Sequence, residues 1–281
     1  MKRILLITLL LLAGCQQSTE KQSHDKTMRI ISLMPSNTEI LYELGLDNEI
    51  IGVSTADDYP EDVATKARFD GFNLNKEVLL KAQPTLIVAH QSAQAAQNKI
   101  LSDLQQQGIE VLYVTDATRL SEIDDTIRQI AAAAGRTEEG ETLSAAVNKQ
   151  IDDVITNYPD ARHNNVFLEV SSEPEIYTGG SGTLYDDMLT KLGSTNVFHE
   201  VQGWQPVSKE AIVRTDPDVM ITTSGQSEED YNKTVMNRGG FKEVTAVRDS
   251  RIYALNADWI SRPGPRIAKG LEALAKILSD K

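Results

Sequence analysis

The side chains that point to ligand chemistry in this chain are aromatic rings in polar surroundings. Aromatic residues make up only 5% of the sequence. Five of them fall in segments that we predict to be loops: Tyr59, Phe72, Tyr177, Trp204 and Trp259. A large ring in a loop is costly unless it packs against a ligand or another element. We therefore expect these rings to line a binding site, although each ring taken singly is equally suited to closing an edge of the fold.

Five further residues accompany these rings at the predicted carboxyl ends of strands, where open α/β sheets bind their ligands. They are Pro35, Ser36, His90, Asp258 and Arg262. His90 is suited to hydrogen-bonding a ligand, to coordinating a metal within it, or to a structural role. All five join the rings as predicted ligand-binding residues.

The sequence gives little support for a catalytic function. There is no Gly-x-Ser-x-Gly turn, and no pair of histidines has metal-ligand spacing. Gly179-Gly180-Ser181-Gly182 lacks the lysine and spacing of a phosphate loop and is better interpreted as a turn into a helix. We expect no catalytic residue, no resident metal and no cofactor. An exported α/β enzyme is the less favoured alternative.

The N-terminus indicates export. Met1-Lys2-Arg3 precedes an apolar run that ends at Leu12-Ala13-Gly14-Cys15, which resembles the bacterial lipobox. We predict a signal peptide over 1–14, lipidation at Cys15, and a polar tether over 15–27. The protein would then be extracytoplasmic, with the lipid holding it to a membrane. The net charge of −13 argues against a nucleic-acid partner, which requires basic patches.

One stretch occurs twice and indicates how the chain is divided. Residues 75–88 and 208–221 share a Lys-Glu pair, three apolar residues, a proline and an apolar run. Each copy predicts a short helix, a proline stop and a buried strand. The repeat implies two similar lobes that each carry an equivalent glutamate, Glu77 and Glu210. Two matched carboxylates could dock on a two-fold partner that presents arginines to both.

Strands alternate with helices on both sides of one long helix. Strands are predicted over 29–34, 49–53, 85–89 and 110–114, and again over 165–170, 219–222 and 251–255. The helix, over about 138–158, would be roughly 30 Å long. We predict an α/β fold of two lobes with mostly parallel sheets, at 28–136 and 161–281, joined by a backbone helix within 137–160, with the ligand cleft between the lobes. Ser36-Asn37-Thr38-Glu39 is interpreted as a capping box.

Several stretches together resemble a known family. They are Ile30 to Glu39, Asp58-Tyr59-Pro60, Asn75-Lys76-Glu77, Trp204 to Glu210, and Asp258-Trp259 with Pro265-Arg266-Ile267. Over about residues 28–280 the chain is similar to the substrate-binding lipoproteins of ABC importers for vitamin B12 and iron chelates, especially those that bind cobalamin. The first and last stretches are typical of that subgroup.

The resemblance implies a function and a partner. Tyr177, Trp204, Asp258 and Trp259 would line a cleft for cobalamin or a related corrinoid, and Glu77 and Glu210 would pair with arginines of the permease dimer, which works with its ATPase subunits.

The sequence also departs from the cobalamin binders. An aromatic expected near Ala56 is missing, Phe72 stands in for a tryptophan near Gly71, and His90 occupies an aromatic position. Haem or a ferric siderophore is therefore an open alternative. For an anionic chelate, Arg68 and Arg262 are the available cleft arginines.

Overall fold

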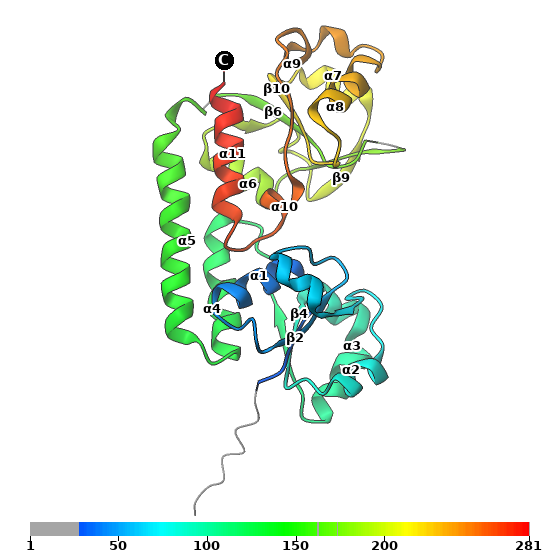
Figure 1. The fold of residues 1–281 in the computed structure, drawn as a ribbon. Helices are drawn as coiled ribbons and strands as arrows, with labels where there is room; N and C mark the ends of the chain where they lie inside the picture. Colours follow the sequence, from blue (N-terminus) through cyan, green and yellow to red (C-terminus); the bar gives the residue numbers. More distant parts are fainter. Residues whose placement is uncertain (1–27, 162, 173, 281) are drawn as a thin grey trace, which may run out of the picture.

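The protein consists of two α/β lobes, one above the other, with a long helix running along one side of both (Figure 1). The structure is a computed structural model that describes residues 28–161, 163–172 and 174–280. The predicted signal peptide, Cys15 and the tether lie outside the described residues. The two-lobed α/β class predicted from the sequence is confirmed.

The N-terminal lobe is built on a five-stranded parallel sheet with the order β3-β2-β1-β4-β5. Its strands are β1 (Ile30–Ser32), β2 (Ile50–Ser54), β3 (Ala67–Phe69), β4 (Leu86–His90) and β5 (Glu110–Val114). Its helices are α1 (Pro35–Glu43), α2 (Lys76–Ala82), α3 (Gln91–Gln106) and α4 (Ile123–Ala133), with 3₁₀ turns at Glu61–Thr65 and Leu120–Glu122. The central strands are apolar runs because helices cover both faces of the sheet.

The C-terminal lobe has a four-stranded parallel sheet with the order β11-β10-β6-β8, and a separate antiparallel ribbon, β7-β9. The strands are β6 (Asn165–Glu169), β7 (Ile176–Gly179), β8 (Thr195–Asn196), β9 (Trp204–Val207), β10 (Val219–Thr222) and β11 (Ile252–Ala254). The helices are α6 (Leu184–Lys191), α7 (Lys209–Thr215), α8 (Glu228–Met236), α9 (Thr245–Arg248), α10 (Ala257–Ser261) and α11 (Ile267–Ser279), with 3₁₀ turns at Pro159–Ala161 and Phe241–Glu243.

Two predictions about this lobe are wrong. Tyr177 and Trp204 lie on strands β7 and β9 rather than in loops, and Trp259, also expected in a loop, lies on α10. Both ribbon strands are four residues long, and β9 is largely exposed, so neither shows the apolar periodicity of a core strand. Helix α10 has only five residues, too few for a periodic signal.

The duplicated stretch folds in the same way twice. Asn75 caps α2 by accepting hydrogen bonds from the backbone N–H groups of Glu77 and Val78, and Ser208 caps α7 by accepting one from Ala211. Each helix ends at a residue in the left-handed region, followed by a proline and a strand within its sheet, β4 or β10. The repeat predicted from the sequence is therefore a repeated structural unit.

The predicted capping box at the start of α1 is wrong. The residue preceding the helix is Met34, which provides no side-chain cap, and Ser36 and Glu39 lie inside the helix. The Glu39 carboxylate is directed to arginines of the other lobe instead. A charge-assisted contact between lobes has displaced the local bond that the sequence pattern suggests.

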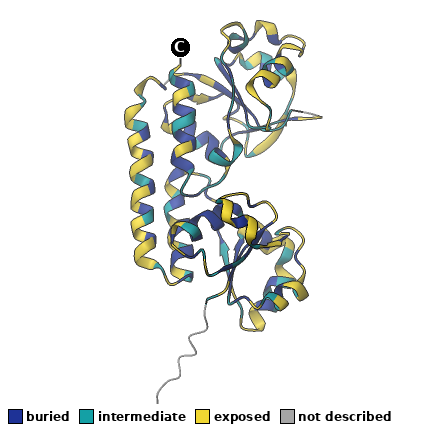
Figure 2. Ribbon diagram, viewed as in Figure 1, coloured by how far each residue is buried: buried dark blue, intermediate teal, exposed yellow. Residues whose placement is uncertain are grey.

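One large apolar cluster runs through both lobes, and each lobe also has a smaller cluster of its own. Helix α5 (Thr137–Asn157) packs against α4 of the first lobe and α11 of the second. One continuous cluster of buried side chains joins Ile30 and Val88 of the first sheet to Val166 and Ile221 of the second. The buried inner faces of the helices and sheets follow this path in Figure 2. None of the helices in the described part of the chain is long and apolar enough to span a membrane.

Candidate functional site

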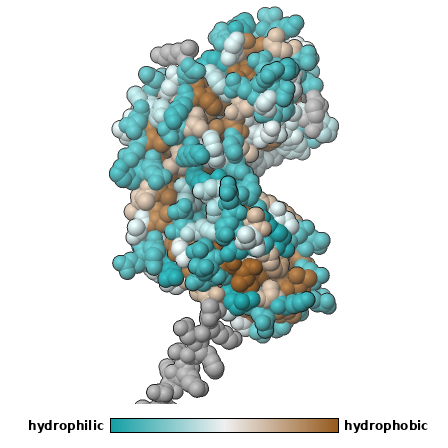
Figure 3. Space-filling view, in the orientation of Figure 1, coloured by the Kyte–Doolittle hydropathy of each residue, from teal (hydrophilic) through white to brown (hydrophobic). Residues whose placement is uncertain are grey.

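The surface is hollowed between the two lobes, on the side opposite α5 (Figure 3). Strand β1 leads into α1, and strand β11 leads into α10. These helices lie where the lobes meet, so the carboxyl ends of both parallel sheets are directed at the hollow (Figure 1). This is the edge at which open α/β sheets bind ligands.

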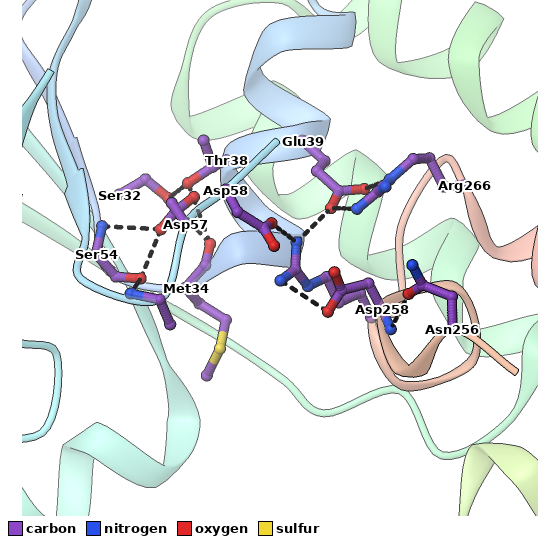
Figure 4. Close-up of polar contacts among 12 residues, drawn as sticks. Ser32, Met34, Thr38, Glu39, Ser54, Asp57, Asp58, Asn256, Asp258 and Arg266 are labelled. Atoms are coloured by element: carbon purple, nitrogen blue, oxygen red, sulfur yellow. Dashed lines mark hydrogen bonds and ion pairs between the residues drawn. The ribbon is translucent and has the colours of Figure 1, made fainter. Parts of the chain in front are cut away.

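Five charged side chains join the lobes at this place, and we call them the interlobe ion network: Glu39, Asp58, Asp258, Arg262 and Arg266 (Figure 4). Arg266 donates from Nε to Glu39 Oε2 at 2.8 Å and from Nη2 to Glu39 Oε1 at 2.5 Å. Arg262 donates from Nη1 to Asp58 Oδ1 at 2.7 Å, and its Nη2 lies 2.8 Å from Asp258 Oδ1. Arg262 Nη1 also lies 3.3 Å from Glu39 Oε1, so both arginines share this carboxylate.

The network is buried at one end and open at the other. Glu39 is only 2% exposed, whereas the Asp58 side chain is 61% exposed at the rim. Burial raises the pKa of Asp58, but the hydrogen bond and charge of Arg262 outweigh it, so this pKa is lowered. Burial raises the pKa of Asp258, helped by the nearby Asp58 carboxylate. The two rim carboxylates therefore lie close together and depend on Arg262 to neutralise them.

Two of the predicted aromatic residues adjoin this network. The Arg266 guanidinium lies 4.0 Å from the centre of the Tyr59 ring, which is 41% exposed. Trp259 on α10 is partly buried against the shared core, and the ammonium group of Lys269 lies 4.1 Å from its ring centre. The Tyr59 ring is thus partly open to solvent beside the network, while much of the Trp259 side chain anchors α10.

The other pair of aromatic residues shares one face of the β7-β9 ribbon. Trp204 is paired with Gly179 and Tyr177 with Pro206, and opposite and alternate residues of antiparallel strands lie on the same face. A Cβ atom on Gly179 would lie 2.7 Å from the Trp204 ring, so the ring packs directly over the glycine. Trp204 is nonetheless 49% exposed. Strand β9 lies on the side of the C-terminal lobe that is turned toward the N-terminal lobe (Figure 1).

The remaining predicted ligand residues lie at or near the carboxyl ends of strands in the N-terminal sheet, and they differ in how exposed and how strongly bonded they are. Phe72, in the turn after β3, is 77% exposed. Pro35 and Ser36 form the buried first turn of α1. His90 caps α3 at the end of β4, where Ser92 lies 2.6 Å from its Nδ1 and Asp116 contacts its Nε2. The imidazole of His90 is therefore already bound on both sides.

Arg68, the second arginine considered for an anionic ligand, is also engaged. Its Nη1 donates to the backbone carbonyl oxygens of Ser54 at 3.0 Å and Asp57 at 2.6 Å. The buried carboxylate of Asp57 in turn accepts from the backbone N–H and hydroxyl of Ser54, at 2.9 and 2.5 Å. Arg68 therefore shapes the loop that carries Asp58 and Tyr59.

Sequence reasoning missed Glu39, Asp58 and Arg266 as members of the site. A usable signal was present, because an acidic residue inside an apolar helix and two arginines four positions apart are typical of buried ion pairs. The sequence could not show that Glu39 pairs with Arg266, since the two residues are separated by 227 positions. In the described part of the chain no group of three or more His, Cys, Asp or Glu could hold a metal ion.

Glu77 and Glu210 lie away from the network. Each is the exposed second residue of its helix, α2 or α7. The two helices lie on different lobes, on the side of the molecule away from α5 (Figure 1). Their equivalent placement follows from the repeated unit.

Comparison with known proteins identifies the family. The model of the periplasmic binding protein family matches residues 30–259. The chain belongs to the periplasmic binding proteins.

Relatives of known sequence and structure agree with this assignment. An uncharacterized ABC transporter substrate-binding lipoprotein of Bacillus subtilis is 36% identical over 88% of this chain and 79% of its own length. A possible iron-binding, periplasmic solute-binding protein of Staphylococcus epidermidis is 45% identical with a TM-score of 0.82, covering 90% of this chain and 98% of its own. The vitamin B12-binding protein of Vibrio cholerae is 29% identical with a TM-score of 0.76, covering 89% and 96%.

Periplasmic binding proteins are extracytoplasmic solute-binding proteins rather than enzymes, and this chain shares that class. Membership in the family disfavours the exported enzyme considered from the sequence.

Proposed function

We propose that this periplasmic binding protein captures cobalamin or a related corrinoid between its lobes and delivers it to the permease of an ABC importer. The observation that carries the proposal is that both lobes contribute aromatic rings that are at least partly open to solvent. Tyr59 comes from the first lobe, and Tyr177 and Trp204 from the ribbon of the second. Aromatic rings supplied by both lobes suit a bulky, largely apolar macrocycle.

Charge at the hollow separates the candidate ligands. The interlobe ion network contains three carboxylates and two guanidinium groups, and both arginines already contact carboxylates. An anionic ferric siderophore would meet an excess of negative charge here, which disfavours its binding. A corrinoid that carries no large negative charge avoids this repulsion. The likeness to a vitamin B12-binding protein supports the same choice.

An iron chelate is the second candidate, and one observation favours it. The 45% identical protein of Staphylococcus epidermidis has a possible iron-binding role. A haem or a ferric siderophore would use the same aromatic rings, and His90 lies at the carboxyl end of strand β4. Isothermal titration calorimetry of the purified protein with cyanocobalamin, haem and ferric siderophores would separate the two. Heat with an iron chelate and none with any corrinoid, at micromolar protein, would overturn the first choice.

Docking on the permease and attachment to the membrane are proposed from two exposed glutamates and from the N-terminal sequence. Glu77 and Glu210 would form ion pairs with arginines on the two halves of a permease dimer that works with ATPase subunits. Lipidation of Cys15 would hold the protein at the membrane. Mass spectrometry of the mature N-terminus, for a diacylglyceryl group on Cys15, tests the anchor.

A further inference from the structure

The interlobe ion network is organised around one carboxylate that a ligand in the hollow does not reach. Glu39 is 2% exposed, on α1 of the first lobe. Both of its oxygens are taken by Arg266, and one of them also lies near Arg262. Those arginines belong to the second lobe, so one side chain of the first lobe fixes two side chains of the second.

Each arginine in turn holds a part of the cleft. Arg266 stacks on the ring of Tyr59, and Arg262 binds the carboxylates of Asp58 and Asp258. Tyr59 and the two aspartates are partly open to solvent, whereas Arg262 and Arg266 are mostly buried. The contacts therefore connect the buried Glu39 carboxylate, through the two arginines, to the partly exposed side chains of Tyr59, Asp58 and Asp258.

A planar guanidinium held at two points keeps a fixed orientation, and whatever it contacts next is fixed with it. Side chains that are already ordered lose less entropy when a ligand binds. Without Glu39, the arginines would turn toward the aspartates, and the stack on Tyr59 would loosen. Binding affinity would then fall although no ligand contact had been removed.

We propose that Glu39 is a positioning residue of the cleft, which orders Tyr59, Asp58 and Asp258 through Arg262 and Arg266. The proposal rests on the proposed function, because ligand affinity is what the positioning serves. Glu39 itself touches no ligand.

The test compares Glu39→Gln with a matched change in a buried ion pair that is not part of the interlobe ion network. Glu169 and Arg238 form a bidentate pair at 2.6 and 2.7 Å, buried entirely within the second lobe. Glu169→Gln removes the same charge from the same kind of pair. Affinity for cyanocobalamin is measured by calorimetry and thermal unfolding by circular dichroism, for both variants and the wild type.

We expect Glu39→Gln to weaken cyanocobalamin binding roughly tenfold or more, and Glu169→Gln to leave it within about twofold, although both lower the melting temperature. Equal effects of the two variants on affinity would overturn the proposal, because a general loss of stability would then explain both. If Glu39→Gln does not fold, Arg266→Lys takes its place, since lysine keeps the charge but cannot form both bonds and the stack.

A second measurement works without ligand and separates this proposal from the proposed function. Hydrogen–deuterium exchange should quicken over 56–60 and 257–262 in Glu39→Gln, but not in Glu169→Gln. Unchanged exchange in those segments would overturn the positioning role. A wild-type protein that binds no corrinoid would instead overturn the proposed function, while the exchange result would still decide the role of Glu39.

Discussion

Asp57 is a buried acidic residue that directly precedes Asp58 of the interlobe ion network. Its carboxylate is buried, with Oδ2 bonded twice to Ser54 and Oδ1 without a hydrogen-bond partner. Burial raises the pKa of this carboxyl, although its hydrogen bonds and the charge of Arg262 oppose the rise. A carboxyl whose pKa is higher in the folded protein destabilises the fold when it is ionised, and this cost disappears as the pH falls through the raised pKa.

Asp57→Asn should therefore stabilise the protein at neutral pH. Asparagine can still accept both bonds from Ser54 through its amide oxygen, without a buried charge. We expect a melting temperature about 2–4 °C higher at pH 7, the shift that about 1 kcal/mol gives in a chain of this size. Below about pH 4 the difference should vanish, because both side chains are then neutral. A melting temperature that is lower at every pH would show that the carboxylate makes an indispensable bond.

At the scale of single elements, the β7-β9 ribbon carries two of the predicted ligand-binding rings, Tyr177 and Trp204. It places Trp204 directly over Gly179, where no larger residue fits. The ring is held by the backbone beneath it and is still half open to solvent. An aromatic surface ordered in this way meets a ligand at little entropic cost.

Trp204→Ala should weaken corrinoid binding by about 1.5–3 kcal/mol, or roughly 10- to 100-fold, because the ring offers a large apolar face. The melting temperature should change little, since the exposed half of the ring adds nothing to the core. Titration calorimetry with cyanocobalamin gives the affinity. Met236→Ala, which removes an exposed apolar side chain from α8, is the control and should bind like the wild type. Wild-type affinity in Trp204→Ala would remove the ribbon from the binding site.

The sequence predicted the central elements well and the short ones poorly. Strand β5 has the predicted bounds, and β1, β4 and β6 lie inside their predicted ranges or within a residue of them, because apolar runs between prolines and glycines mark buried parallel strands. The ribbon, α10 and the short strands β3 and β8 have no such pattern, since their pairing partners or packing surfaces come from distant parts of the chain.

The candidate site was likewise predictable only in part. The aromatic rings could be named from their types, and the structure places Tyr59 beside the interlobe ion network and Tyr177 with Trp204 on the β7-β9 ribbon. Arg262 was predicted as a ligand contact, but its guanidinium is shared among Glu39, Asp58 and Asp258. Such sharing depends on how the two lobes face each other, which no local pattern encodes.

At the scale of the whole molecule, the repeated unit gives the docking proposal a direct test. The double variant Glu77→Ala with Glu210→Ala should abolish uptake of labelled cobalamin in cells that depend on this protein, because both ion pairs to the permease are lost. Calorimetry on the purified variant should show unchanged ligand affinity, since neither side chain belongs to the interlobe ion network or to the aromatic ribbon.

The control for this test is Glu138→Ala with Glu139→Ala. These glutamates are also exposed in the first turn of a helix, but on α5, at the opposite side of the molecule. The control removes the same charge and should sustain uptake. Normal uptake by the Glu77 and Glu210 double variant would refute the docking proposal.

The shared core predicts that the lobes unfold together. Helices α4, α5 and α11 pack in one apolar cluster with residues of both sheets, so neither lobe has a core of its own on that face. Scanning calorimetry should give one transition whose calorimetric and van't Hoff enthalpies agree. Two separated transitions, or a stable isolated fragment of residues 28–136, would contradict this.

A core that continues across the lobes also bears on how loaded and empty copies compete. Because the lobes cannot swing far apart, Glu77 and Glu210 keep nearly the same separation whether or not a ligand lies between them. A partner that recognises only this spacing would bind an empty copy as readily as a full one. Empty copies would then occupy importers unproductively, and transport would be fastest when the number of binding proteins is matched to the supply of ligand.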